Sequence, residues 1–119
     1  MQVEAILRSM GGNGLYAGYE SMALCIRLVL NHPKTLLALQ KEVYSAVAKE
    51  QGTSVSCLKR RLDIFLDVLW RNAKPEQWRT LGLSVCERPT VGEFIEAVVW
   101  YIQSKQAEHD QEQKRRKIS

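Results

Sequence analysis

The sequence has few of the residues that several common folds and sites require. Two Phe, three Pro and seven Gly in 119 residues argue against a turn-rich β-sandwich and favour helices. The three cysteines, Cys25, Cys57 and Cys86, form no C-x-x-C pair and fit no zinc-site spacing, so we expect three free thiols and no metal site. No apolar run approaches the roughly 18 residues of a membrane span, and the N-terminus does not have the pattern of a signal peptide.

Catalytic constellations are equally absent from the sequence. The two histidines are isolated, no carboxylates pair at a plausible site, and no nucleophile lies beside a base, so we expect neither an enzyme, a cofactor nor a small-molecule substrate. The glycines Gly11, Gly12 and Gly14 lack the Lys-Ser/Thr of a phosphate-binding P-loop and no strand precedes them, so we interpret them as an inter-helix loop. These absences together predict a soluble cytoplasmic protein that works by binding.

What the sequence does contain is ordinary for one globular domain. Hydrophobic residues make up 45% and charged residues 25% of the chain, which are usual values for a single domain of this length. The net charge of +4 suits an anionic partner without proving one. We place the folded domain at residues 1–103, because apolar periodicity stops there. Residues 104–119 are expected to form a polar, basic, disordered tail.

Apolar periodicity and breakers predict an all-α fold of about six helices. The expected helices cover residues 3–10, 19–30, 35–50, 55–71 and 75–81, with a last helix after Thr90. Thr90 and Glu93 form the S/T-x-x-E pattern of a capping box. We interpret Trp100 and Tyr101, on this last helix, as packing residues rather than as a base-stacking platform, because a helix presents neighbouring residues to different sides.

The stretch between residues 41 and 71 has the layout of a helix-turn-helix. Residues 41–50 are expected to form the first helix, and Gly52 supplies a left-handed residue that ends it. Ser54 is the expected N-cap of the second helix, with Thr53 as the other candidate. In the second helix an apolar stripe is predicted to be buried: Leu58, Leu62, Phe65, Leu66 and Leu69. The opposite face begins with basic residues, as in helices that read the DNA major groove. A solvated helix face of mixed charge accounts for the same pattern.

Several landmarks, in order and spacing, give the chain a family resemblance. They are Gly18-Tyr19, Val43-Tyr44, Ala48-Lys49, Thr53-Ser54, Ser56, Val68, Trp70, Arg88-Pro89-Thr90 and Glu93-Phe94-Ile95. Between residues 3 and 103 the chain resembles the C-terminal DNA-binding effector domain of the bacterial stage-zero sporulation response regulator. The resemblance implies a compact six-helix bundle with a helix-turn-helix. It also implies a bacterial transcription regulator that binds tandem sites on double-stranded DNA as a homodimer.

The chain departs from the family pattern where the family reads bases. Cys57 replaces an arginine, Lys59 a glutamate and Ile64 a histidine; Asp63 replaces a basic residue, and only Arg60 keeps its type. We therefore expect a sequence preference that differs from the family's own site. No receiver domain precedes the first helix in this sequence, which suggests a stand-alone effector domain. The loop before the Arg-Pro-Thr block is shorter, and the basic tail is extra.

Our first hypothesis is a DNA-binding regulator whose second motif helix reads bases. The base-reading candidates are Ser56, Cys57, Lys59, Arg60, Asp63 and Ile64. The phosphate candidates are Lys49, Ser54, Arg61, Arg88, Lys114, Arg115, Arg116 and Lys117. The basic tail alternatively resembles a nuclear-localisation signal or only adds solubility.

Two alternatives remain beside this hypothesis. The same fold can act as an interaction module that binds a partner regulator without reading DNA, which the exposed Ile64 and the changed residues favour. Cys57, near a helix N-terminus and beside Lys59 and Arg60, is a candidate redox-sensing thiol.

Overall fold

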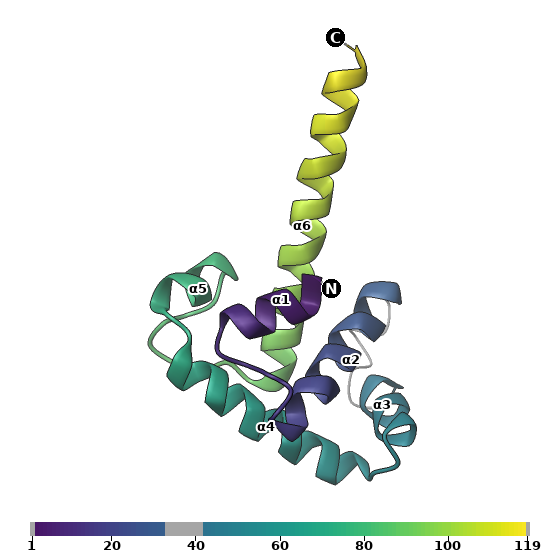
Figure 1. The fold of residues 1–119 in the computed structure, drawn as a ribbon, viewed down its shortest axis with the longest axis vertical. Helices are drawn as coiled ribbons and strands as arrows, with labels where there is room; N and C mark the ends of the chain where they lie inside the picture. Colours follow the sequence, from purple (N-terminus) through teal and green to yellow (C-terminus); the bar gives the residue numbers. More distant parts are fainter. Residues whose placement is uncertain (1, 33–41, 119) are drawn as a thin grey trace.

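The computed structural model is all-helical within the residues it describes, which are 2–32 and 42–118, with side chains described as far as Lys114. The helices are α1 (Gln2–Ser9), α2 (Ala17–Asn31), α3 (Tyr44–Glu50), α4 (Val55–Asn72), α5 (Pro75–Thr80) and α6 (Val91–Ile118) (Figure 1). The predicted all-α fold of about six helices is therefore confirmed. The expected start of the 35–50 helix falls in residues 33–41, which lie outside the described residues.

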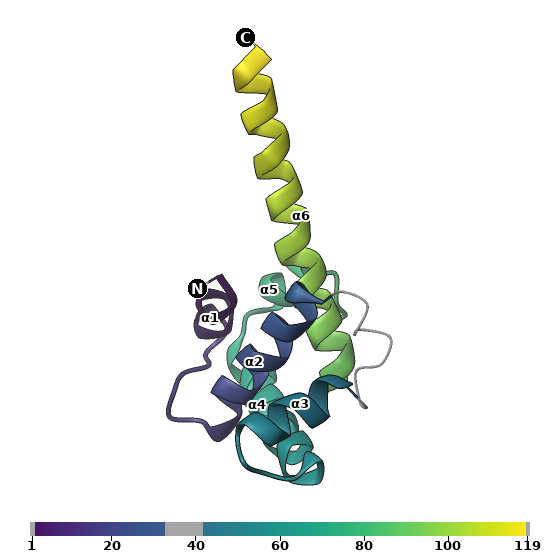
Figure 2. The same cartoon turned by 90° about the vertical axis from the view of Figure 1, so that its right-hand side faces the viewer.

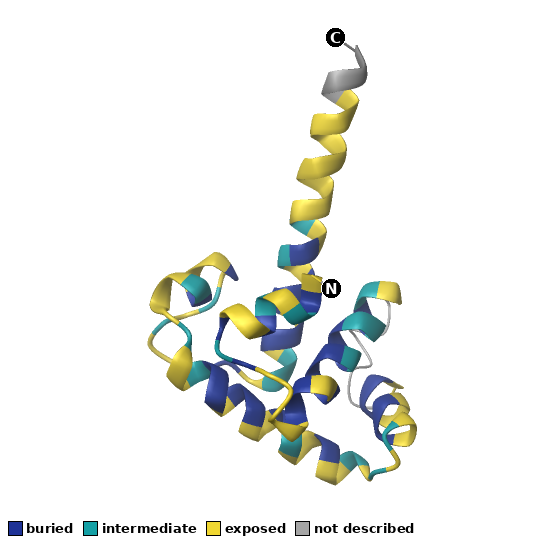
Figure 3. Ribbon diagram, viewed as in Figure 1, coloured by how far each residue is buried: buried dark blue, intermediate teal, exposed yellow. Residues whose placement is uncertain are grey.

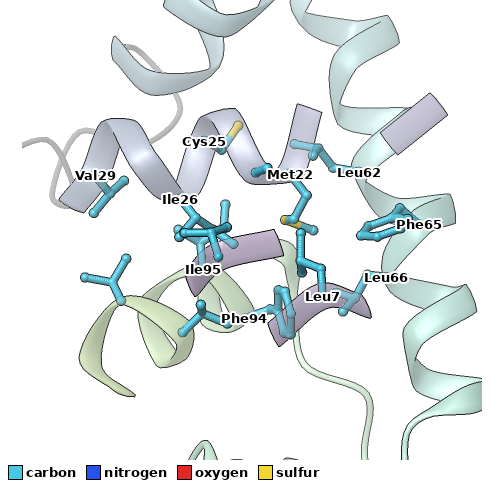
Figure 4. Close-up of a cluster of buried hydrophobic side chains, with 14 of the residues drawn as sticks. Leu7, Met22, Cys25, Ile26, Val29, Leu62, Phe65, Leu66, Phe94 and Ile95 are labelled. Atoms are coloured by element: carbon cyan, nitrogen blue, oxygen red, sulfur yellow. The ribbon is translucent and has the colours of Figure 1, made fainter. Parts of the chain in front are cut away.

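Helices α1, α2, α4 and α6 together enclose the hydrophobic core (Figure 4). The apolar stripe predicted for residues 55–71 is confirmed, because its members are fully buried in α4. They meet side chains from the other three helices, and the largest of these are Leu7, Met22, Ile26, Phe94 and Ile95. Each such side chain contributes about 1.5–3 kcal/mol when it is removed from water. This burial packs one side of α4 against the core and leaves its other side exposed to the solvent (Figure 3).

Helices α2 and α4 approach each other closely at Gly18. A Cβ atom on Gly18 would lie 2.4 Å from the carbonyl oxygen of Arg61 and 2.6 Å from Cβ of Phe65. Both of these atoms belong to or adjoin the α4 backbone, which cannot move without shifting the whole helix. The glycine is therefore required by the packing of the two helices rather than by its own backbone angles.

We expect Gly18→Ala to lower the free energy of unfolding by about 1–3 kcal/mol, the usual cost of forcing an extra methyl group into a packed core. Urea unfolding followed by circular dichroism measures this loss. Gly14→Ala is the matched control, because a Cβ atom there would meet nothing within 4 Å. Equal stability of the two variants would contradict a tight α2–α4 crossing.

The start of α6 has the capping box that the sequence predicted. The Thr90 backbone N–H donates to Oε1 of Glu93 at 3.2 Å, and the Glu93 backbone N–H donates to the Thr90 hydroxyl at 3.1 Å. Each bond satisfies a backbone donor that the first turn of a helix leaves unpaired. Pro89, the residue before the cap, is buried. The loop that leads into α6 is therefore held firmly against the body.

Beyond the core, α6 continues as an exposed helix where the sequence predicted a disordered tail. It extends to Ile118 and projects away from the other helices (Figures 1 and 2). Polar side chains one turn apart contact each other along it: Lys105 with Glu108, Gln106 with Asp110, and His109 with Gln113. The prediction rested on the missing apolar stripe, but such local pairs support a helix that packs on nothing. The domain boundary at residue 103 stays a prediction.

The aromatic side chains divide between the core and the surface. Trp78 anchors α5 as expected: it is buried, with its ring centroid 5.1 Å from that of Trp70 and 6.0 Å from that of Phe94. The interpretation of Trp100 as a packing residue is wrong, because 54% of it is exposed. Trp100 directly follows the buried Val98 and Val99 on α6. Because successive residues of a helix point to different sides, its side chain is turned away from the core. Tyr101 is half-buried against the core, in line with the packing role.

Candidate nucleic-acid interface

The turn between α3 and α4 is built as the sequence predicted. Gly52 has a φ of +66°, and the Thr53 N–H donates to the Ala48 carbonyl at 2.9 Å, which closes the end of α3. The Ser54 hydroxyl oxygen accepts from the Cys57 N–H at 3.1 Å and caps the start of α4. Two helices joined by a short glycine-containing turn are the framework of a helix-turn-helix.

Packing presents one side of α4 to the solvent. Tyr44, Val47 and Ala48 of α3 are buried with the apolar stripe of α4, so the first motif helix supports the second. The structure brings all six base-reading candidates together on the exposed side: Ser56, Cys57, Lys59, Arg60, Asp63 and Ile64. Ile64 is 54% exposed, an unusual position for an isoleucine in a helix with a buried stripe. These six residues on the exposed side of α4 are the largest group of predicted site residues that the fold brings together.

Lys59 lies beside the ring of Tyr44. Its Nζ atom is 5.8 Å from the ring centroid, a distance at which an ammonium group is attracted to the face of an aromatic ring. Burial raises the pKa of Tyr44 to about 12, with smaller contributions from Cys25 and Asp63. The ring therefore stays neutral at physiological pH, so it attracts the ammonium group of Lys59 without forming an ion pair with it. The ammonium group keeps its capacity to bind an anion.

Arg88 is engaged by α4 rather than free, which sequence reasoning did not anticipate. Its Nη2 is 3.0 Å from Oδ1 of Asp63, and its Nε is 3.1 Å from Oδ1 of Asp67. Its remaining nitrogen, Nη1, is buried with no hydrogen-bond partner in the described part of the chain. A hollow of about 630 Å³ lies here, lined by Tyr44, Lys59, Leu62, Asp63, Arg88, Thr90, Val91 and Gly92. The carboxylate of Asp63 therefore has a cationic partner.

The other phosphate candidates are spread unevenly around the motif. Lys49 is exposed near the end of α3, Ser54 caps α4, and Arg61 is half-buried on α4. Lys114 is exposed near the far end of α6, away from the α3–α4 turn (Figures 1 and 2). The side chains of the remaining candidates, Arg115, Arg116 and Lys117, lie outside the described residues.

The cysteines differ sharply in accessibility. Cys25 is buried while Cys57 and Cys86 are exposed, and all three are free thiols. Burial raises the pKa of Cys25 to about 12, so its reactive thiolate form is absent at pH 7–9.

We expect a thiol-alkylating reagent to add two groups to the native protein and three to the urea-unfolded protein, counted by mass spectrometry. A third adduct formed at the same rate in the native state would contradict this assignment.

Residues 2–32 and 42–118 contain no group of three or more His, Cys, Asp and Glu side chains arranged to hold a metal ion. In the same ranges no helix is both long and apolar enough to cross a bilayer.

The chain matches the model of a known protein family. The family model described as "Sporulation initiation factor Spo0A C terminal" matches residues 3–102. The match begins in α1 and ends inside α6, so it contains the whole helix-turn-helix and the Arg88-Pro89-Thr90 block. The projecting part of α6 lies beyond it.

Proposed function

The chain belongs to the Spo0A C-terminal family of DNA-binding transcription-factor domains, and we propose that its helix α4 reads double-stranded DNA in the major groove. The observation that carries this proposal is the exposed start of α4, where Ser56, Lys59 and Arg60 lie together. The opposite side of this helix is held in place by its buried apolar stripe. A recognition helix contacts base edges with its N-terminal residues. The Ser54 cap places these residues in the first two turns of α4.

Lys59 and Arg60 are the principal base-reading residues of the proposal. Both carry long cationic side chains that donate to the O6 and N7 atoms of guanine or to phosphate oxygens. Ser56 adds a short hydroxyl that donates or accepts. Cys57 and Ile64 offer apolar contact, which suits a thymine methyl group. The preferred DNA sequence is thus expected to contain guanine near the centre of each half-site.

Phosphate contacts would come from both sides of the motif. Lys49 and Arg61 flank the exposed start of α4, and the Ser54 hydroxyl can still donate its proton while its oxygen caps the helix. The basic end of α6 is a different case. About 16 residues of helix beyond the core span about 24 Å, directed away from the turn. We therefore leave Lys114–Lys117 out of the contacts to a single straight duplex.

A mobility-shift titration against a pool of random duplexes tests the proposal directly. At about 50 mM salt, where phosphate contacts are strongest, we expect retarded complexes. Selection and sequencing of the bound fraction then shows the preferred site. The proposal fails if no complex forms at this salt concentration, or if bound and unbound pools have the same composition at every position.

A second candidate function is that of an interaction module for a partner regulator. It is favoured by the exposure of Ile64, an apolar side chain in the middle of the proposed reading face. Such a module would form a stable heteromer in a pull-down with a full-length regulator and show no DNA retardation. Ile64→Glu would then abolish the heteromer, because it places a charge in an apolar contact.

A further inference from the structure

Arg88 joins two parts of the fold that are distant in the sequence. It lies in the loop between α5 and α6, directly before the buried Pro89 and the Thr90 cap. Its guanidinium bridges Asp63 and Asp67, which stand one turn apart on α4, at 3.0 and 3.1 Å. The Arg88 side chain is 29% exposed, whereas those of Asp63 and Asp67 are 61% and 56% exposed. The arginine thus covers the two acids from the side of the protein body.

The two carboxylates lie on the side of α4 that would face DNA, where their negative charge is unfavourable. They follow Lys59 and Arg60 by one and two turns on the same exposed side of α4. A duplex carries one negative charge per roughly 1.7 Å of its axis, so unpaired acids here would repel the backbone on either side of the groove. Carboxylates four residues apart on a helix also repel each other. A cation that reaches both of them removes each of these penalties.

We propose that Arg88 makes DNA binding possible by neutralising Asp63 and Asp67, and that it is a positioning residue rather than a phosphate ligand. This inference rests on the proposed function. Two of its three guanidinium nitrogens are bonded to carboxylates, and the third, Nη1, is buried. None of the three is therefore directed freely toward a duplex. The role of Arg88 is exerted through the charge of its two partners.

Charge rescue separates this role from direct contact. We expect Arg88→Gln to weaken duplex binding roughly tenfold at low salt, since it exposes two unscreened charges to the phosphates. Arg88→Lys keeps the positive charge beside the two acids but loses the forked guanidinium that reaches both of them, so it is expected to recover only part of the affinity that Arg88→Gln loses. In the Asp63→Asn/Asp67→Asn background the acids are gone, and adding Arg88→Gln is expected to change affinity by less than roughly threefold.

Each outcome of this cycle decides the question. A large loss from Arg88→Gln in both backgrounds would show that Arg88 touches phosphate, or holds α4 in place by packing, and would overturn the proposal. A negligible loss in the parent background would overturn it as well. Urea unfolding of every variant confirms that it is folded, which is expected because exposed ion pairs contribute little to stability. If the parent protein binds no duplex, the proposed function fails first.

Discussion

Replacing Lys59 and Arg60 together by alanine is expected to weaken binding to a selected duplex by roughly 30-fold or more. Each well-placed cationic contact to guanine is worth about 1–3 kcal/mol, so two cost about 2–6 kcal/mol, and 1.4 kcal/mol corresponds to a factor of ten. Both side chains are exposed at the start of α4. Fluorescence anisotropy with a labelled duplex, at a fixed salt concentration, measures the change.

The control for this prediction removes two positive charges elsewhere. Lys74 and Arg79 are exposed on and before α5, which lies apart from the α3–α4 turn (Figure 1). Lys74→Ala/Arg79→Ala therefore causes the same change in net charge without touching the proposed reading face. An equal loss of affinity in the two double variants would show that only net charge matters. The assignment of α4 as a recognition helix would then be wrong.

Phe65→Ala is expected to lower the free energy of unfolding by about 3–5 kcal/mol, the usual cost of removing a buried phenyl ring. Phe65 is fully buried, and its ring lies 6.2 Å from that of Tyr16 and 6.0 Å from that of Tyr19, measured between centroids. Its loss leaves a cavity between α2 and α4. Because small domains are stable by only about 5–15 kcal/mol, the variant should be close to unfolding at 37 °C.

Ile64→Ala provides the matched comparison, since Ile64 precedes Phe65 on the same helix and is 54% exposed. We expect its unfolding free energy to stay within about 0.5 kcal/mol of the parent, as for most surface substitutions. Denaturation in urea, followed by far-ultraviolet circular dichroism, gives both values. If Phe65→Ala cost less than about 1 kcal/mol, the α2–α4 contact would not be the centre of the core.

Much of the fold and of the proposed site was predictable because it depends on local rules. The stripe of Leu58, Leu62 and Phe65 follows from the helical repeat, and the capping box of Thr90 with Glu93 follows from a spacing of three. Gly52 and Ser54 mark the turn by their own conformational and hydrogen-bonding preferences. The exposed position of all six base-reading candidates then follows from the buried stripe. The family match, over residues 3–102, spans all of these positions.

The failures have equally definite causes. Trp100 was interpreted as a packing residue because a helix presents it and Tyr101 to different sides, but the side that Trp100 takes lies away from the buried face of α6. Residues 104–119 were expected to form a disordered tail because no apolar stripe continues past Ile102, whereas α6 extends to Ile118. Exposed helices of this kind rely instead on polar contacts such as that between Lys105 and Glu108. Amino-acid composition alone sets neither the exposure of Trp100 nor the continuation of α6 beyond the core.

By itself, the sequence determined the apolar stripe of α4, the turn before it and the side of α4 that faces the solvent. Only the tertiary structure decided which charged side chains on that side pair with one another. Arg88 is 25 residues from Asp63 along the chain, and no periodicity or spacing rule connects them. They meet because the core brings the loop before α6 against α4. The sequence suggested a phosphate-binding arginine and a base-reading aspartate, whereas the fold pairs them with each other.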